Sequence, residues 1–137
     1  MPFEVCWEPY GVIKRYWGHV SKSDFTASSR QLYNSPRFDN VRFVINDFSS
    51  AESHGIDDDA LEDYIAGRLG CASYRPEIRE VCVAKSPQLL TFCQLMAHPQ
   101  SSSTIGVRIF SSLAEARSWL NHLRAPHQQT TQFAGNW

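Results

Sequence analysis

The order of hydrophobic and polar positions predicts strands and helices that alternate along most of the chain. The strand-like segments, with short apolar runs or alternation, are residues 3–8, 11–18, 41–48, 80–85 and 106–110. Pro9 and Gly11 predict a tight turn, so the first two strands should form an antiparallel hairpin. The later strands are separated by single helical segments, which predicts parallel pairing with right-handed crossovers.

Helical spacing of apolar residues predicts four helices, which follow Ser21, Asp57, Ser86 and Ser112. Two starts have capping-box patterns, Ser21 with Asp24 and Ser112 with Glu115. The predicted fold class is therefore α/β, in the order β-β-α-β-α-β-α-β-α, with a mixed five-stranded sheet. Periodicity ends after Arg124, so we expect one domain over residues 1–124 and a mobile tail over 125–137.

Composition excludes several classes of function. The 137 residues carry 13 Lys and Arg against 14 Asp and Glu, so no basic field favours nucleic acid. No apolar run approaches the roughly 20 residues that cross a bilayer, and the N-terminus lacks a leader pattern, so a cytoplasmic protein is expected. The cysteines are widely spaced, which predicts reduced thiols. The histidines lack metal-ligand spacing, and no metal or cofactor is expected.

Four stretches resemble one family. GVIKRYWGHVSKSDF, SPRFDNVRFVINDFSS, ID-x-x-A-L and VRIFSSLAEARSWL are similar to the SpoIIAA-like proteins, a bacterial group with a STAS-like fold. The resemblance extends from Gly11 to Leu123. It implies the fold of the anti-sigma-factor antagonists. Because that fold is similar to the CRAL-TRIO-type lipid carriers, it also implies an apolar ligand or peripheral association with the inner membrane.

The segment from Asn46 to Tyr64 supports three interpretations. The antagonists carry Asp-Ser-Ser-Gly before the helix that follows their third strand, and the second serine takes the phosphate. Here the matching residues are Glu52-Ser53-His54-Gly55, and the aspartates at 57–59 would repel a phosphate. The simplest interpretation is that Asp57 caps the helix. The alternatives are a phosphorylation site at Ser49, Ser50 or Ser53, and a divalent-metal site that combines Asp47 with the aspartate run.

The helix PQLLTFCQLMAH predicts a binding surface. Its apolar residues cover an arc of about 220°, wider than the roughly 100° that suffices for packing on a sheet. Leu90 and Leu95 should therefore contact another helix, a subunit, a ligand or a membrane. In the preceding helix Arg68 lies on the apolar face, which predicts an ion pair with a carboxylate such as Asp47 or Asp63, or a hook for an anionic head group. The candidate ligand-binding residues are Leu61, Ile65, Arg68, Leu69, Leu89, Leu90, Phe92, Leu95, Met96 and Phe110.

The sequence therefore favours a non-enzymatic binding module that holds a lipid-like, apolar or amphiphilic ligand, or a membrane surface, under the helices at 57–73 and 87–98. The alternative is a protein-interaction switch related to the anti-sigma-factor antagonists and controlled by a serine. The exposed edge of the first hairpin and the surplus leucines also predict a homodimer.

Overall fold

The computed structural model describes residues 2–72, 75, 77–97 and 107–131, with backbone alone at 72 and 124–131. Its elements are β1 (Phe3–Glu8), β2 (Gly11–Val20), α1 (Lys22–Tyr33), η1 (Pro36–Asn40), β3 (Phe43–His54), α2 (Asp58–Ala72), β4 (Arg79–Ala84), α3 (Pro87–Ala97), β5 (Val107–Phe110) and α4 (Leu113–Thr131). One five-stranded sheet has the order β1-β2-β3-β4-β5. Only the β1–β2 pair is antiparallel within it. The predicted fold class is confirmed.

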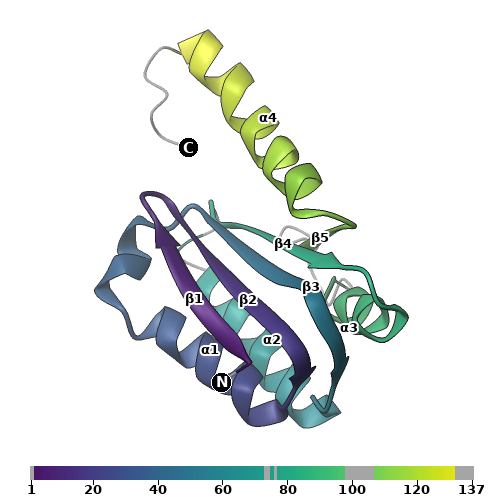
Figure 1. The fold of residues 1–137 in the computed structure, drawn as a ribbon. Coiled ribbons are helices and arrows are strands. Elements are labelled where there is room, and N and C mark those ends of the chain that lie inside the picture. The colour runs from purple at the N-terminus through teal and green to yellow at the C-terminus, as the bar shows by residue number, and fades with distance from the viewer. Residues whose placement is uncertain (1, 73–74, 76, 98–106, 132–137) are drawn as a thin grey trace.

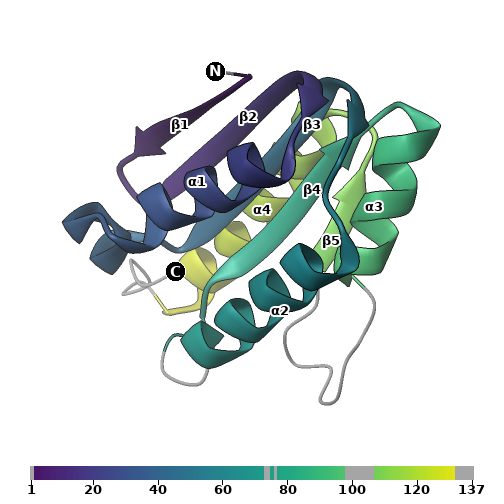
Figure 2. The same cartoon turned by 90° about the horizontal axis from the view of Figure 1, so that it is seen from below.

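The helices divide between the two faces of the sheet. Figures 1 and 2 show α1, α2 and α3 on one face and α4 on the other. Alternation along the strands produces this division. Tyr16, Phe48 and Cys82 face α1–α3 in one apolar cluster, whereas Ile45 and Val81 pack with Ala116 and Leu120 of α4 in another. An ion pair between Arg117 of α4 and Glu8 of β1 joins this helix to the edge strand of the sheet.

The third strand is longer than predicted. It was expected to end at Phe48, yet β3 continues to His54 because its backbone stays paired with β2 as far as Val20. The register shifts twice along this pairing, the second time between Gly18 and His19. Gly18 has φ 65°, a left-handed conformation that glycine adopts at little cost. The candidate serines of this segment therefore lie on a strand.

Helix starts follow the predicted capping patterns. Ser21 and Asp24 form a reciprocal capping box at α1. The backbone N–H of Glu115 donates to Ser112 Oγ (3.1 Å), but the Glu115 carboxylate accepts from the backbone and hydroxyl of Ser111 instead of completing the box. Helix α4 continues to Thr131, so the first part of the predicted tail, residues 125–131, is helical. The rest of the predicted tail, 132–137, lies outside the described residues.

Candidate functional site

A cluster of charged side chains is buried between the sheet and helices α1 and α2. Lys14, Arg68 and Glu80 are 0%, 7% and 7% exposed. Lys14 pairs in the strand register with Asn46, and the Asn46 amide donates to Glu80 Oε2 (2.8 Å). Arg68 Nε lies 3.7 Å from Glu80 Oε1 and has no hydrogen-bond partner of its own in the described structure. One carboxylate thus faces two buried cations.

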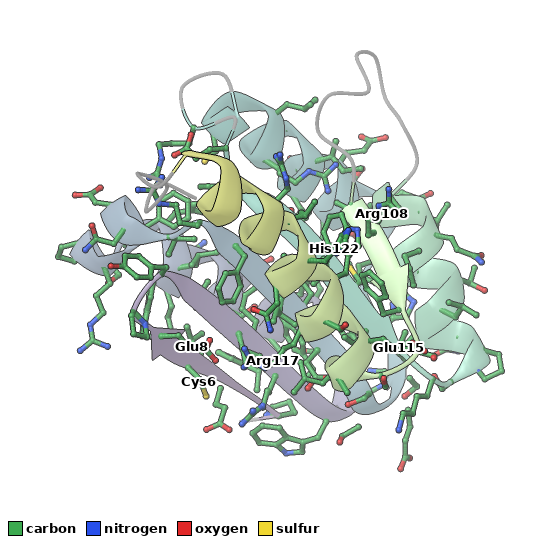
Figure 3. All side chains as sticks on the ribbon, turned by 90° about the horizontal axis from the view of Figure 1, so that it is seen from above. Cys6, Glu8, Arg108, Glu115, Arg117 and His122 are labelled. Atoms are coloured by element: carbon green, nitrogen blue, oxygen red, sulfur yellow. The ribbon has the colours of Figure 1, made fainter. Side chains whose placement is uncertain are left out.

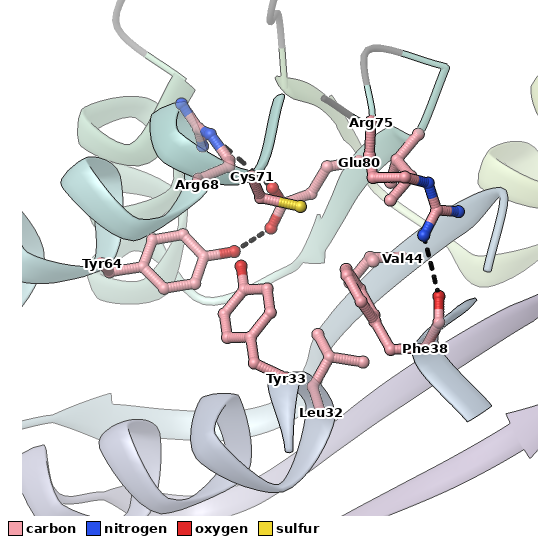
Figure 4. A pocket seen from close by; sticks show the side chains of 10 residues that line it. Leu32, Tyr33, Phe38, Val44, Tyr64, Arg68, Cys71, Arg75 and Glu80 are labelled. Atoms are coloured by element: carbon pink, nitrogen blue, oxygen red, sulfur yellow. Dashed lines mark hydrogen bonds and ion pairs between the residues drawn. The ribbon is translucent and has the colours of Figure 1, made fainter. Parts of the chain in front are cut away.

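Tyrosine hydroxyls complete this cluster. The Tyr64 hydroxyl donates to Glu80, and Figure 4 shows the Tyr33 hydroxyl directed toward the same point. Burial, followed by the nearby charge of Glu80, raises the pKa of Tyr64 well above its usual value. Beside them lies a cavity of about 30 Å³, which is large enough for one water molecule. The phenols therefore stay protonated at neutral pH and act as hydrogen-bond donors.

A groove runs between α1 and α2 above the cluster. Its volume is about 300 Å³, and its lining residues are Phe25, Thr26, Ser29, Arg30, Tyr33, Asn34, Ala60, Asp63, Tyr64 and Gly67. Aromatic rings form part of its wall. Two of them, Phe25 and Tyr64, contact each other with ring centres 5.0 Å apart. An apolar wall with a few polar groups is typical of small-molecule sites.

A second, more open groove lies between α2 and α3. Its volume is about 580 Å³, and its lining residues are Asp58, Leu61, Glu62, Ile65, Ala66, Leu69 and Leu95. Leu95 is 49% exposed. Leu90, on the same helix but outside this groove, is 36% exposed. Neither leucine is therefore covered by another helix of the described structure, which was one of the contacts expected for them.

The predicted ligand-binding residues do not share one site. Leu61, Ile65, Leu69 and Leu95 meet in the α2–α3 groove, whereas Leu90 is exposed outside it. Leu89, Phe92 and Met96 are fully packed against the sheet. Phe110 lies on the opposite face of the sheet, against Trp119 of α4, so its inclusion was wrong: alternation turns it away from α3.

The predicted ion pair of Arg68 with a carboxylate is present, but neither of the two carboxylates named as examples is the partner. The guanidinium pairs with Glu80 of β4, and its Nη1 donates to the Met96 carbonyl (3.3 Å). Asp47 lies in the register between Arg15 and Val83, which places it on the α4 face, and its carboxylate accepts from Ser49. Asp63 is exposed in the α1–α2 groove. Arg68 is thus already bound within the protein and is a poor hook for an external head group.

The serines of β3 have different surroundings. The Ser49 hydroxyl donates to Asp47 (2.6 Å), and Ser50 is exposed. Ser53 Oγ lies 2.7 Å from His19 Nδ1 on the neighbouring strand. His54 accepts a hydrogen bond from the backbone of Ile56 (3.0 Å), and partial burial, followed by the charge of His19, lowers its pKa. Ser53 therefore lies where the C-terminal ends of β2 and β3 pair, a few residues before α2 begins.

The aspartate run begins α2 as predicted. Asp57 accepts from the backbone N–H of Ala60 (2.9 Å), which is a helix cap. Its carboxylate also pairs with Lys22 (3.2 Å). The backbone hydrogen bond, and after it the bond from Lys22, lowers the pKa of Asp57. The interpretation of Asp57 as a cap is confirmed.

Two side-chain contacts of α4 are described on the other face of the sheet, an ion pair and a cation–π contact. Figure 3 shows Arg117 reaching from α4 toward Glu8 of β1, with two hydrogen bonds of 3.1 and 2.5 Å. The Arg108 guanidinium lies 5.0 Å from the Trp119 ring, a cation–π contact. These contacts hold α4 on the sheet.

Sequence reasoning missed the three polar members of the buried cluster, Lys14, Asn46 and Glu80. Alternation along the strand places Lys14 on the same face as the apolar residues Val12 and Tyr16, but the sequence does not show that this face is buried at both of them, as the structure does. Among the described residues, no group of three His, Cys, Asp or Glu side chains could hold a metal ion. None of the described helices is long and apolar enough to cross a bilayer.

The fold is SpoIIAA-like, as the resemblance predicted. The chain is similar to the anti-sigma factor antagonist SpoIIAA in its unphosphorylated form, with a TM-score of 0.59 and 14% identity over 90% of this chain and 98% of that chain. It is also similar to an uncharacterized protein of the DUF3478 family from Shewanella loihica PV-4, with a TM-score of 0.54 and 13% identity over 86% and 91% of the two chains. No family model and no curated protein sequence matches the chain.

Proposed function

We propose that the protein is a non-enzymatic binding module that recognises a partner protein through the α2–α3 groove. The exposure of Leu95 carries this proposal, because the side chain is 49% exposed beside an apolar row on α2. Burying a leucine fully stabilises a complex by roughly 1.5–3 kcal/mol. The similar structure of an anti-sigma factor antagonist supports recognition of another protein as the general mode of action.

The charges of the groove favour a protein over a lipid. Asp58 and Glu62 line it, and no lysine or arginine is among its lining residues. Carboxylates repel fatty acids and anionic membranes, which polybasic surfaces attract. An amphipathic partner helix would place apolar residues against Leu61, Ile65 and Leu95 and basic residues at the acidic margin.

Peptide selection with a matched control tests this proposal. Helical peptides selected from a displayed library on the intact protein should be amphipathic and basic. Their affinity should fall at least tenfold in Leu95→Asp and stay within twofold in Leu90→Asp, which alters an exposed leucine of the same helix outside the groove. Binding of oleate or phosphatidylglycerol vesicles at this groove, without peptide binding, would reject it in favour of a lipid.

A second candidate function is control by phosphorylation of Ser53. Ser53 is near the end of β3, and its hydroxyl oxygen lies 2.7 Å from Nδ1 of His19 on β2. Lys22 lies near the same helix start and is occupied by Asp57. A phosphate on Ser53 would compete with Asp57 for Lys22, although it would also meet the repulsion of the neighbouring carboxylates.

Mass spectrometry tests this second candidate. Protein recovered from its own cells should carry one phosphate on Ser53, absent in Ser53→Ala and retained in Ser50→Ala. Phosphate on Ser50 instead, or none under growth and starvation, would argue against a switch at Ser53.

A further inference from the structure

Lys14 is a buried cation without an anionic partner of its own. Its side chain is 0% exposed in the middle of β2. The ammonium nitrogen lies 3.4 Å from Ser29 Oγ, 5.6 Å from the centre of the Phe25 ring and 5.1 Å from that of Tyr64. Within the described part of the chain, it forms no ion pair with a carboxylate. A buried charge in this state is costly unless something pairs with it.

The residues around this ammonium group also line the α1–α2 groove. Phe25, Ser29 and Tyr64 each contact Lys14 on one side and contribute to the groove wall on the other. The ammonium therefore lies directly behind that wall, and the Ser29 hydroxyl connects the two. Burial lowers the pKa of Lys14 to about 8, with Glu80 opposing the shift, so the group is still mainly protonated at pH 7.

The groove itself fits a small flat molecule. Its volume of about 300 Å³ is at the lower end of the range for ligand sites, roughly 300–1,000 Å³. Rings of Phe25, Tyr33 and Tyr64 offer stacking surfaces. Arg30 on the α1 wall adds a positive charge, whereas Asp63 on the α2 wall disfavours a ligand with more than one negative charge.

We propose that the α1–α2 groove binds a small aromatic anion whose acidic group accepts a hydrogen bond from Ser29 and is attracted by the Lys14 ammonium directly behind that hydroxyl. The aromatic body lies along Tyr33 and Tyr64. A carboxylate fits the site better than a phosphate, because Asp63 opposes a second negative charge. This ligand site is separate from the α2–α3 groove, so either proposal can fail without the other.

Titration with matched probes tests the site. We expect 2-naphthoate to bind the intact protein saturably and at least tenfold more tightly than the neutral 2-naphthamide, with NMR shifts centred on Phe25, Ser29 and Tyr64. Affinity for 2-naphthyl phosphate should be lower than for the carboxylate. The reverse order would support an anion site but would contradict the preference for a carboxylate over a phosphate.

Two variants separate Lys14 from the other cation of the groove. Lys14→Met should fold, because the unbranched apolar side chain fills similar space without a charge, and should reduce naphthoate affinity at least tenfold. Arg30→Met should reduce it less than threefold. No saturable binding of any probe, equal binding of acid and amide, or a loss confined to Arg30→Met would overturn the proposal. If Lys14→Met does not fold, the acid–amide comparison and the NMR map decide alone.

Discussion

The sheet face beneath α1 and α2 differs from the same face beneath α3. Beneath α1 and α2 it carries Lys14 and Glu80, both buried. Beneath α3 it meets Leu89, Phe92 and Met96, which are at most 2% exposed. The two regions are neighbours, since Arg68 bonds both Glu80 and the Met96 carbonyl.

This difference assigns separate tasks to the two regions. Apolar burial stabilises a fold at roughly 25 cal/mol per Å², so the α3 region contributes stability directly. Buried ion pairs are often no better for stability than apolar residues of the same volume. Buried charges that cost stability are most often found where a protein binds something, which points to the α1–α2 region as a site.

Removing the single carboxylate of the charged region should have the largest effect. Glu80→Gln leaves Arg68 buried without its ion-pair partner and removes a negative charge that favours the protonated form of Lys14, and we expect a loss of about 3–5 kcal/mol in the free energy of unfolding. Urea denaturation followed by circular dichroism measures it. The matched control is Glu77→Gln, which breaks a more exposed pair with Arg75 and should lose less than about 1 kcal/mol. Equal losses would mean that the buried charges are not coupled.

Truncating the apolar region should have the next largest effect. Leu89 is 0% exposed, so Leu89→Ala should lower the free energy of unfolding by about 2–4 kcal/mol. Leu90→Ala, one residue further along α3 and exposed, should change it by less than about 0.5 kcal/mol. A large loss at Leu90 would show that this residue is covered by other parts of the protein and is not the exposed leucine described above.

The apolar region was the part that sequence could predict. Its helix and strands follow periods of 3.6 and 2, and these periods alone identify the inward faces. Leu90 and Leu95 stood out because they exceed the width of one packing face. The prediction failed for Phe110 because a four-residue strand holds too few alternations to fix its facing.

The charged region escaped prediction for a different reason. A single Lys14 between Val12 and Tyr16 looks like an ordinary interruption of a strand, and only the assembled sheet shows that its row continues into Asn46. The partner of Arg68 lies on another strand, so topology and register decide it. The grooves depend on the distances between helices, which side-chain packing sets and no periodicity encodes.

The smallest of these effects is the pH dependence contributed by Lys14. Burial lowers its folded pKa to about 8, below the usual 10.5, so the unfolded chain binds more protons between these values. Stability contributed by this group should therefore rise with pH across that window, by about 1–2 kcal/mol between pH 7.5 and 9.5. Ending at pH 9.5 limits opposing effects from Tyr16 and Tyr64, whose pKa values are raised in the fold and which lose stability only above about pH 10.

Urea unfolding at the two pH values measures this contribution by subtraction. Lys14→Met should remove the rise, whereas Lys85→Met, which alters an exposed lysine, should retain it. A hydrogen bond with Cys93, followed by burial, raises the pKa of the Cys82 thiol, and the Lys14 charge opposes that shift. The difference between Lys85→Met and Lys14→Met therefore measures Lys14 together with its effect on Cys82. If wild type and Lys14→Met respond equally to pH, Lys14 has an ordinary proton affinity. The charged region would then lack the unpaired cation that distinguishes it from the apolar region.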